Sequence, residues 1–111
     1  MRQSYTAVVE RANPLSGEFA TEPYETGWAR EAVIFVKVRE EPGDNVELRA
    51  RVQISPDGID WVDEGTTFPA IRRRGVYFVK VSNFGNWLRL AGRVTDPGAK
   101  IRALVYIALK E

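Results

Sequence analysis

The chain of 111 residues contains no cysteine and no histidine. Without cysteine it can form no disulfide, no thiolate metal site and no thiol nucleophile. Without histidine it lacks the side chain that most often serves as general base, zinc ligand or pH switch. These two absences remove most familiar catalytic and metal-binding arrangements, so we expect a protein that is not an enzyme and that has no metal and no cofactor.

An excess of one charge and long apolar runs are also missing. The 16 basic and 15 acidic residues give a formal net charge of +1, so no global field indicates nucleic acid or an anionic membrane as partner. No apolar run approaches the ~20 residues of a membrane span. The first residues, Met1-Arg2-Gln3-Ser4-Tyr5, lack the apolar core of a signal peptide. We therefore expect a protein outside the membrane that is not secreted by that route.

The sequence does contain a series of short alternating runs. From residue 46 to 54 every second residue is apolar and the others are polar or charged, which is typical of a half-buried strand. Turn residues separate this run from others at 5–11, 18–21, 32–39, 61–63, 65–71, 76–81, 87–95 and 100–109, with an irregular stretch at 24–28. The run 32–39 is apolar at neighbouring positions and is therefore predicted to be buried on much of both faces. The pattern predicts one all-β domain over residues 1–111, an antiparallel β-sandwich of jelly-roll type with seven to nine short strands.

The segment Ser55-Pro56-Asp57-Gly58-Ile59-Asp60-Trp61 predicts a tight hairpin after the 46–54 strand. In such a turn proline presets φ, Asp57 bonds back to the backbone and Gly58 accepts a positive φ. We expect Trp61 to be mostly buried against the 46–54 strand and to anchor the hairpin. Asp57, Gly58 and Trp61 are thus predicted to have structural roles.

The acidic residues in and after this hairpin could instead have a chemical role. Clustered carboxylates can hold Ca²⁺, but the spaced ligands and closing glutamate of an EF-hand loop are missing. Glycoside hydrolysis needs one acid set apart in an apolar pocket, and no such acid is evident. The hairpin also partly matches the Asp-box of sialidase-type propellers, but it occurs once where a propeller needs several. The residues concerned are Asp57, Asp60, Asp63 and Glu64.

Aromatic and arginine residues indicate a candidate interaction surface. Tryptophans can stack on sugars or unpaired bases, although they more often fill the core of a small sandwich. Trp87 is the better surface candidate, since it is out of phase with Leu88 and Leu90. Arginines next to aromatic residues are enriched at interfaces, and Arg49 and Arg51 share one strand face. The alternative is an ordinary solvated face. We take the candidate surface to be Arg72, Arg73, Arg74, Trp87, Arg89 and Arg93.

The order of these features resembles a known group of proteins. An alternating strand is followed by the Ser-Pro-Asp-Gly-x-x-Trp hairpin, then Phe68, Gly75 at a strand start, Trp87-Leu88-Arg89-Leu90 and a final apolar strand. Over about residues 32–110 this resembles the small β-sandwich proteins encoded in structural-gene modules of tailed bacteriophages and prophages. The resemblance implies a virion component, either a head decoration or tail-associated, that contacts capsid or tail proteins and that lies in the bacterial cytoplasm during assembly.

Two functions from different classes follow. The first is a non-enzymatic structural or assembly protein that acts by protein-protein contacts. Such a protein would form a homo-oligomer, for example a trimer, through the terminal strand 101–109 if that strand lies at a sheet edge. The alternative is a carbohydrate-binding β-sandwich module, which the same hairpin also fits. We favour the first because no signal peptide is evident at Met1-Arg2-Gln3-Ser4-Tyr5.

Overall fold

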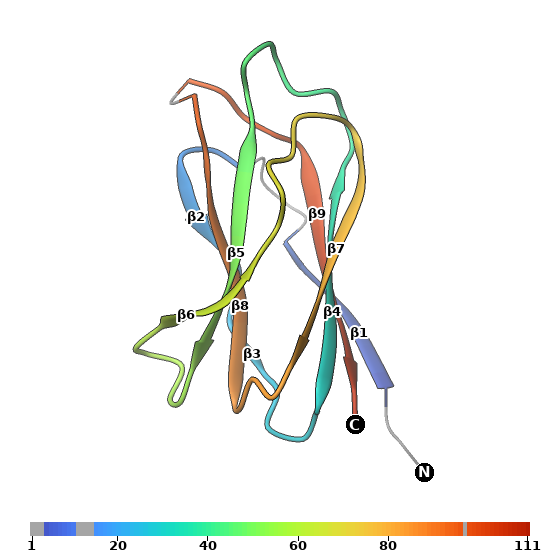
Figure 1. Cartoon of the computed structure of the whole chain (residues 1–111), viewed down its shortest axis with the longest axis vertical. Coiled ribbons are helices and arrows are strands. Elements are labelled where there is room, and N and C mark those ends of the chain that lie inside the picture. Colours follow the sequence, from blue (N-terminus) through green and yellow to red (C-terminus); the bar gives the residue numbers. More distant parts are fainter. Residues whose placement is uncertain (1–3, 11–14, 97) are drawn as a thin grey trace.

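The structure, a computed structural model, describes residues 4–10, 15–96 and 98–111 and consists of strands joined by loops (Figure 1). None of these residues belongs to a helix that is long and apolar enough to cross a membrane. The predicted all-β class is confirmed. The strands in the described ranges are β1 (Ser4–Glu10), β2 (Glu18–Ala20), β3 (Tyr24–Glu25), β4 (Glu31–Val38), β5 (Leu48–Ser55), β6 (Val62–Thr67), β7 (Gly75–Ser82), β8 (Trp87–Val94) and β9 (Ala103–Lys110).

The strands form two antiparallel sheets that face each other (Figure 1). One sheet has the order β1-β9-β4-β7. The other has the order β2-β8-β5-β6, and the short β3 also pairs with β8. If β2 and β3 are taken as one interrupted strand, this is the arrangement of two four-stranded sheets found in a jelly roll. The predicted β-sandwich is therefore confirmed.

The core lies between the sheets because the alternation seen in the sequence turns every second side chain inward. In β4 and β9 the inward residues are branched apolar side chains and alanines, and β5 and β8 supply leucines, valines and an alanine from the opposite sheet. None of them is more than 6% exposed. They are Ala32, Ile34, Val36, Val38, Leu48, Ala50, Val52, Leu88, Leu90, Val94, Ala103, Val105, Ile107 and Leu109.

The structure corrects the prediction of two separate strands at 61–63 and 65–71. They are one strand, β6, which pairs with β5. Its register shifts between Arg51 and Gln53 on β5, and Gly65 has a φ of 114° in the irregular stretch. A glycine tolerates this conformation, so the strand continues through the irregularity instead of ending there.

The terminal strand does not lie at a sheet edge. β9 pairs with β1 on one side and with β4 on the other, so Ile107 stands between Ala7 and Ile34 in register. Self-association through an open β9 edge, which the sequence suggested, therefore has no basis in this fold. The outer strands of this sheet are β1 and β7. The predicted end of the first strand at Arg11 lies outside the described residues.

Candidate functional site

The β5–β6 hairpin has the turn geometry that its sequence predicts. The Ser55 hydroxyl oxygen accepts the N–H of Gly58 at 2.8 Å, and Asp57 Oδ1 accepts the N–H groups of Ile59 at 2.8 Å and Asp60 at 3.0 Å. The N–H groups of Asp60 and Ile59, together with the Ser55 hydroxyl, hold the pKa of Asp57 below its ordinary value. Gly58 has a φ of 79°. Asp57 and Gly58 thus occupy the turn positions that the sequence predicts for them.

Gly58→Val is expected to destabilise the protein more than Gly58→Asn. A β-branched residue is penalised at positive φ, whereas asparagine tolerates it, so we expect valine to cost about 1–3 kcal/mol more. A Cβ at position 58 would lie 3.1 Å from the Trp87 ring, so asparagine should also fall somewhat below the parent. Urea unfolding of the three proteins measures this order. Equal losses for the two variants would show that contact with Trp87, and not φ, limits the position.

Trp61 is not a core residue, contrary to the prediction. It is half-buried on the outer face of the β2-β8-β5-β6 sheet, and the guanidinium of Arg89 lies 4.3 Å from its ring centroid. The register explains this position. Asp63 pairs with Gln53, whose amide bonds to side chains of the outer face, and Trp61 is two residues before Asp63. Residues two apart in a strand share a face, so the tryptophan lies outside.

Four arginines that are distant in the sequence meet on this outer face. Arg49 on β5 pairs in register with Arg93 on β8. Arg51 on β5 pairs in register with Ala91, and Arg89 is two residues from Ala91 along β8. They line a hollow of about 510 Å³, which we call the arginine groove. The structure therefore brings Arg89 and Arg93 together with Arg49 and Arg51, whereas Trp87 is half-buried against Gly58. The groove is lined by Glu18, Phe19, Ala20, Arg49, Arg51, Gln53, Arg89, Ala91, Gly92 and Arg93.

A chain of hydrogen bonds orders one half of the arginine groove. Arg89 Nε donates to Gln53 Oε1 at 2.8 Å, Gln53 Nε2 donates to Asp63 Oδ1 at 2.9 Å, and Arg51 Nε donates to the same oxygen at 2.9 Å. Bonds from Gln53 and Arg51 hold the pKa of Asp63 below its ordinary value. Burial, and then the like charge of Arg51, lower the pKa of Arg89. Arg89 is thus a positive group that is fixed in place without a carboxylate partner in the described part of the chain.

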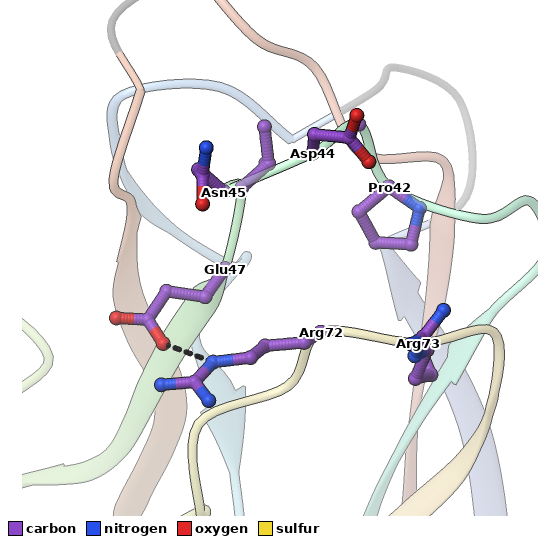
Figure 2. Close-up of a pocket in the computed structure, with 8 residues that line it drawn as sticks. Pro42, Asp44, Asn45, Glu47, Arg72 and Arg73 are labelled. Atoms are coloured by element: carbon purple, nitrogen blue, oxygen red, sulfur yellow. Dashed lines mark hydrogen bonds and ion pairs between the residues drawn. The ribbon is translucent and has the colours of Figure 1, made fainter.

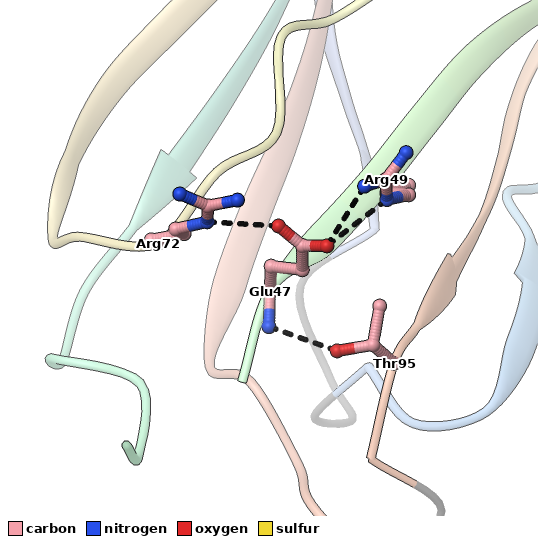
Figure 3. Close-up of polar contacts among 4 residues, drawn as sticks. All are labelled: Glu47, Arg49, Arg72 and Thr95. Atoms are coloured by element: carbon pink, nitrogen blue, oxygen red, sulfur yellow. Dashed lines mark hydrogen bonds and ion pairs between the residues drawn. The ribbon is translucent and has the colours of Figure 1, made fainter. Parts of the chain in front are cut away.

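Glu47 connects the other half of the groove to the loop after β6 (Figure 3). Its Oε1 accepts two bonds from Arg49, at 3.0 and 3.1 Å, and its Oε2 accepts Arg72 Nε at 2.8 Å. Its backbone N–H donates to the Thr95 hydroxyl at 3.1 Å. Arg72 and then Arg49 hold the pKa of Glu47 below its ordinary value. The carboxylate therefore fixes both guanidiniums.

The three successive arginines do not join the arginine groove. Arg72 and Arg73 line a separate hollow of about 440 Å³ against residues 42–47, and Figure 2 shows Arg72 bonded to Glu47 there. The Arg73 carbonyl accepts the Tyr77 hydroxyl at 2.7 Å. Arg74 is exposed and lines neither hollow. The predicted surface is therefore divided, because the loop 72–74 lies at the end of the sandwich and not over the sheet face.

A second surface was missed in the sequence. On the outer face of the β1-β9-β4-β7 sheet, Phe35 on β4 pairs in register with Phe78 on β7 and with Tyr106 on β9. The rings of Phe35 and Phe78 are 6.2 Å apart, and Phe78 and Val76 are 55% and 61% exposed. We call this face the apolar belt. It comprises Val33, Phe35, Val76, Phe78, Leu104, Tyr106 and Ala108, of which Val76 and Phe78 are exposed and the others half-buried.

The signal for the apolar belt was present in the 32–39 run, which is apolar at neighbouring positions and so predicts burial on both faces. In the structure only the inner face of β4 is fully buried, and Val33 and Phe35 on the outer face are half-buried. A strand with two apolar faces thus has only one face covered by its own chain. The acidic residues of the β5–β6 hairpin were considered as metal ligands in the sequence. In the described ranges, no group of three or more possible ligands is placed so that it could hold a metal ion.

The fold and its surfaces define a jelly-roll sandwich with an apolar outer face on one sheet and an arginine-rich outer face on the other. A protein family described as a domain of unknown function, DUF6385, matches residues 42–111. The chain belongs to this family. No curated protein matches it in sequence.

The chain is similar to several solved structures at low sequence identity. The SPBc2 prophage-derived protein YomS superimposes with a TM-score of 0.61 at 8% identity, covering 100% of this chain and 96% of YomS. PirA has a TM-score of 0.47 at 16% identity over 96% of this chain and 92% of its own. FlhE has 0.42 at 12% identity over 99% and 95%. The likeness to YomS extends over the whole sandwich and concerns the fold alone.

Proposed function

We propose that this protein is a non-enzymatic structural or assembly protein of a phage or phage-like particle, as a head decoration or a tail-associated component. The observation that carries the proposal is the apolar belt, which exposes two large side chains next to half-buried aromatic and aliphatic ones on a single sheet face. Contiguous exposed apolar patches of this kind mark protein-protein contacts. The likeness of the fold to a prophage-derived protein supports the phage context.

The belt has the composition of an interface centre. Phe35, Phe78 and Tyr106 form a row across three strands. Lys37, which lies between Val76 and Leu104 in register, flanks this row on one side, and Lys80 on β7 flanks it on the other. Aromatic residues at the centre with charged residues at the rim are the usual anatomy of a contact between proteins. The row reaches the edge strand β7, so a second copy can cover the aromatic side chains and lie against the open edge together. We therefore propose self-association through the belt.

Phe78→Lys is expected to shift the protein from an oligomer to a monomer. The lysine places a charge at the centre of the contact, where its desolvation is unfavourable. Light scattering over a range of concentrations measures the mass. The matched control is Ile59→Lys, because Ile59 is 77% exposed but lies on the β5–β6 hairpin, outside the belt. This control should keep the mass of the parent.

The carbohydrate-binding alternative predicts a monomer that binds sugar and does not bind capsid or tail proteins. A parent protein that stays monomeric at high concentration, shows no affinity for assembled capsids or tails and binds a polysaccharide would overturn the assembly proposal. The geometry of the tryptophans favours assembly over sugar stacking. One face of Trp61 is covered by Arg89, and Trp87 lies against the Gly58 turn.

A further inference from the structure

We propose that the arginine groove is a carboxylate-binding site for an acidic, extended segment of another protein. The inference rests on the proposed function only in taking the partner to be a protein. It concerns the sheet face opposite to the apolar belt and is tested separately from it.

The floor of the groove is made of small side chains, with guanidiniums on both sides. Ala20 on β2 pairs in register with Ala91 on β8, and Ala91 pairs with Arg51 on β5. Two residues further along β8 Arg93 stands beside Arg49, and two residues in the other direction Arg89 stands beside Gln53. The hollow exists because alanines occupy the positions between the long arginine side chains. A ligand group that enters it meets positive charge on both sides.

The chemistry of the groove fits carboxylates. Two of its arginines already bind carboxylates of this chain, since Arg49 donates to Glu47 and Arg51 donates to Asp63. Arg89 donates only to the neutral amide of Gln53. Arg93 stands opposite Glu18 in register but forms no ion pair with it or with any other described residue. Planar guanidinium groups bind carboxylates by paired, charge-assisted hydrogen bonds. Two positive groups in one groove therefore remain available to an incoming acidic partner.

The surrounding charges favour an acidic peptide over a nucleic acid. Glu18 lines the groove itself, and Glu47 and Asp63 neutralise two of its four arginines. A polyanion with a charge at every unit would meet all three of these carboxylates, whereas a peptide with two carboxylates would meet only Glu18, which stands opposite Arg93. The net charge of +1 also gives no long-range attraction for a polyanion.

The spacing of the two arginines without ion pairs defines the ligand further. Arg89 and Arg93 are four residues apart on β8, which corresponds to about 13 Å along a strand. Two acidic residues four apart in an extended peptide span the same distance and point to the same side. The preferred ligand is therefore an extended segment with glutamate or aspartate at positions i and i+4.

The test uses labelled peptides of about ten residues in an extended, threonine-rich background, the length of a long strand. The probe has glutamates at i and i+4. Its controls have glutamine at both positions, or glutamates at i and i+3, which face opposite sides of a strand. We expect the first peptide to bind at least tenfold more tightly than either control, as one charge-assisted hydrogen bond suffices for about tenfold. Equal binding of the three peptides would overturn the inference.

Variants locate the binding. The double variant Arg89→Gln with Arg93→Gln should lose most of the affinity, and Arg74→Gln, outside the groove, should keep it. Unchanged affinity in the double variant would place the peptide elsewhere and contradict the proposal. Tighter binding of a single-stranded oligonucleotide than of the acidic peptide would show that the groove binds nucleic acid, and it would overturn the proposal. This result would not affect the proposed self-association, which light scattering tests separately.

A second measurement needs no partner. Ala20 is exposed and lines the groove, so Ala20→Glu places a carboxylate beside the arginines, and Ala20→Gln is its uncharged control. The glutamate variant is expected to melt about 2–4 °C higher than the glutamine variant at low salt. The difference should vanish in about 1 M NaCl, where the Debye length is short. A glutamate variant that melts at or below the glutamine variant contradicts a carboxylate-binding groove.

Discussion

Replacing Gly92 with valine is expected to remove a large part of the stability of the protein. Gly92 is on β8, and a Cβ built there would overlap the carbonyl oxygen of Arg49. It would also lie 2.9 Å from the Phe19 ring and 3.0 Å from the Cα of Ala50. Two of these three neighbours are backbone atoms of β5, so they can move only if the ladder between β5 and β8 opens. Overpacking of this kind costs about 3 kcal/mol or more, against a total stability of about 5–15 kcal/mol for a domain.

Circular dichroism and urea unfolding measure this loss. Gly92→Ala, which adds only the Cβ, should already be clearly less stable than the parent. Gly43→Ala is the matched control, because a Cβ there meets only the Val46 side chain at an ordinary 3.5 Å. If Gly92→Ala unfolds at the same urea concentration as Gly43→Ala, then β5 and β8 are not held as closely as the structure indicates.

The contact at Gly92 shows which part of the fold the sequence could not predict. Alternation located the strands, since β4, β5, β7 and β8 each begin and end within two residues of the predicted bounds. Alternation says nothing about which strands pair. The role of Gly92 depends on β5 lying beside β8, and the buried position of β9 depends on its place between β1 and β4. Both depend on the jelly-roll topology. The sequence pattern indicated a sandwich of this type but did not indicate which strands are neighbours.

The candidate site depended on register in the same way. Arg49 was predicted to share a strand face with Arg51, and Arg93 was assigned to the candidate surface, but only the pairing of β5 with β8 places Arg49 and Arg93 opposite each other. In the loop 72–74, by contrast, residues that are adjacent in the sequence do not all share a site. Its three adjacent arginines are conspicuous in the sequence, yet only Arg72 is tied to the groove, through Glu47. Residues that share a strand face could be recognised from the sequence, and residues that share a site across strands could not.

The misplacement of Trp61 has the same origin. The hairpin was recognised, but the count of residues across the turn decides which face a side chain takes, and a shift of one residue reverses it. The pair Gln53 and Asp63 fixes that count and sends Trp61 outward to Arg89. The core is therefore stabilised mainly by aliphatic side chains such as Leu90, which is 0% exposed, rather than by the tryptophan.

Leu90→Ala is consequently expected to destabilise the protein far more than Trp61→Ala, although tryptophan is the larger side chain. Leu90 lies opposite Val52 at the centre of the β5–β8 ladder, and its truncation leaves a cavity that costs about 2–5 kcal/mol. Trp61 loses only part of its buried area and one cation–π contact, together about 1–2 kcal/mol. At about 4 °C per kcal/mol, thermal unfolding separates the two variants clearly. A loss for Trp61→Ala equal to that for Leu90→Ala would mean that the tryptophan does anchor the core, and the outward register of the hairpin would then be wrong.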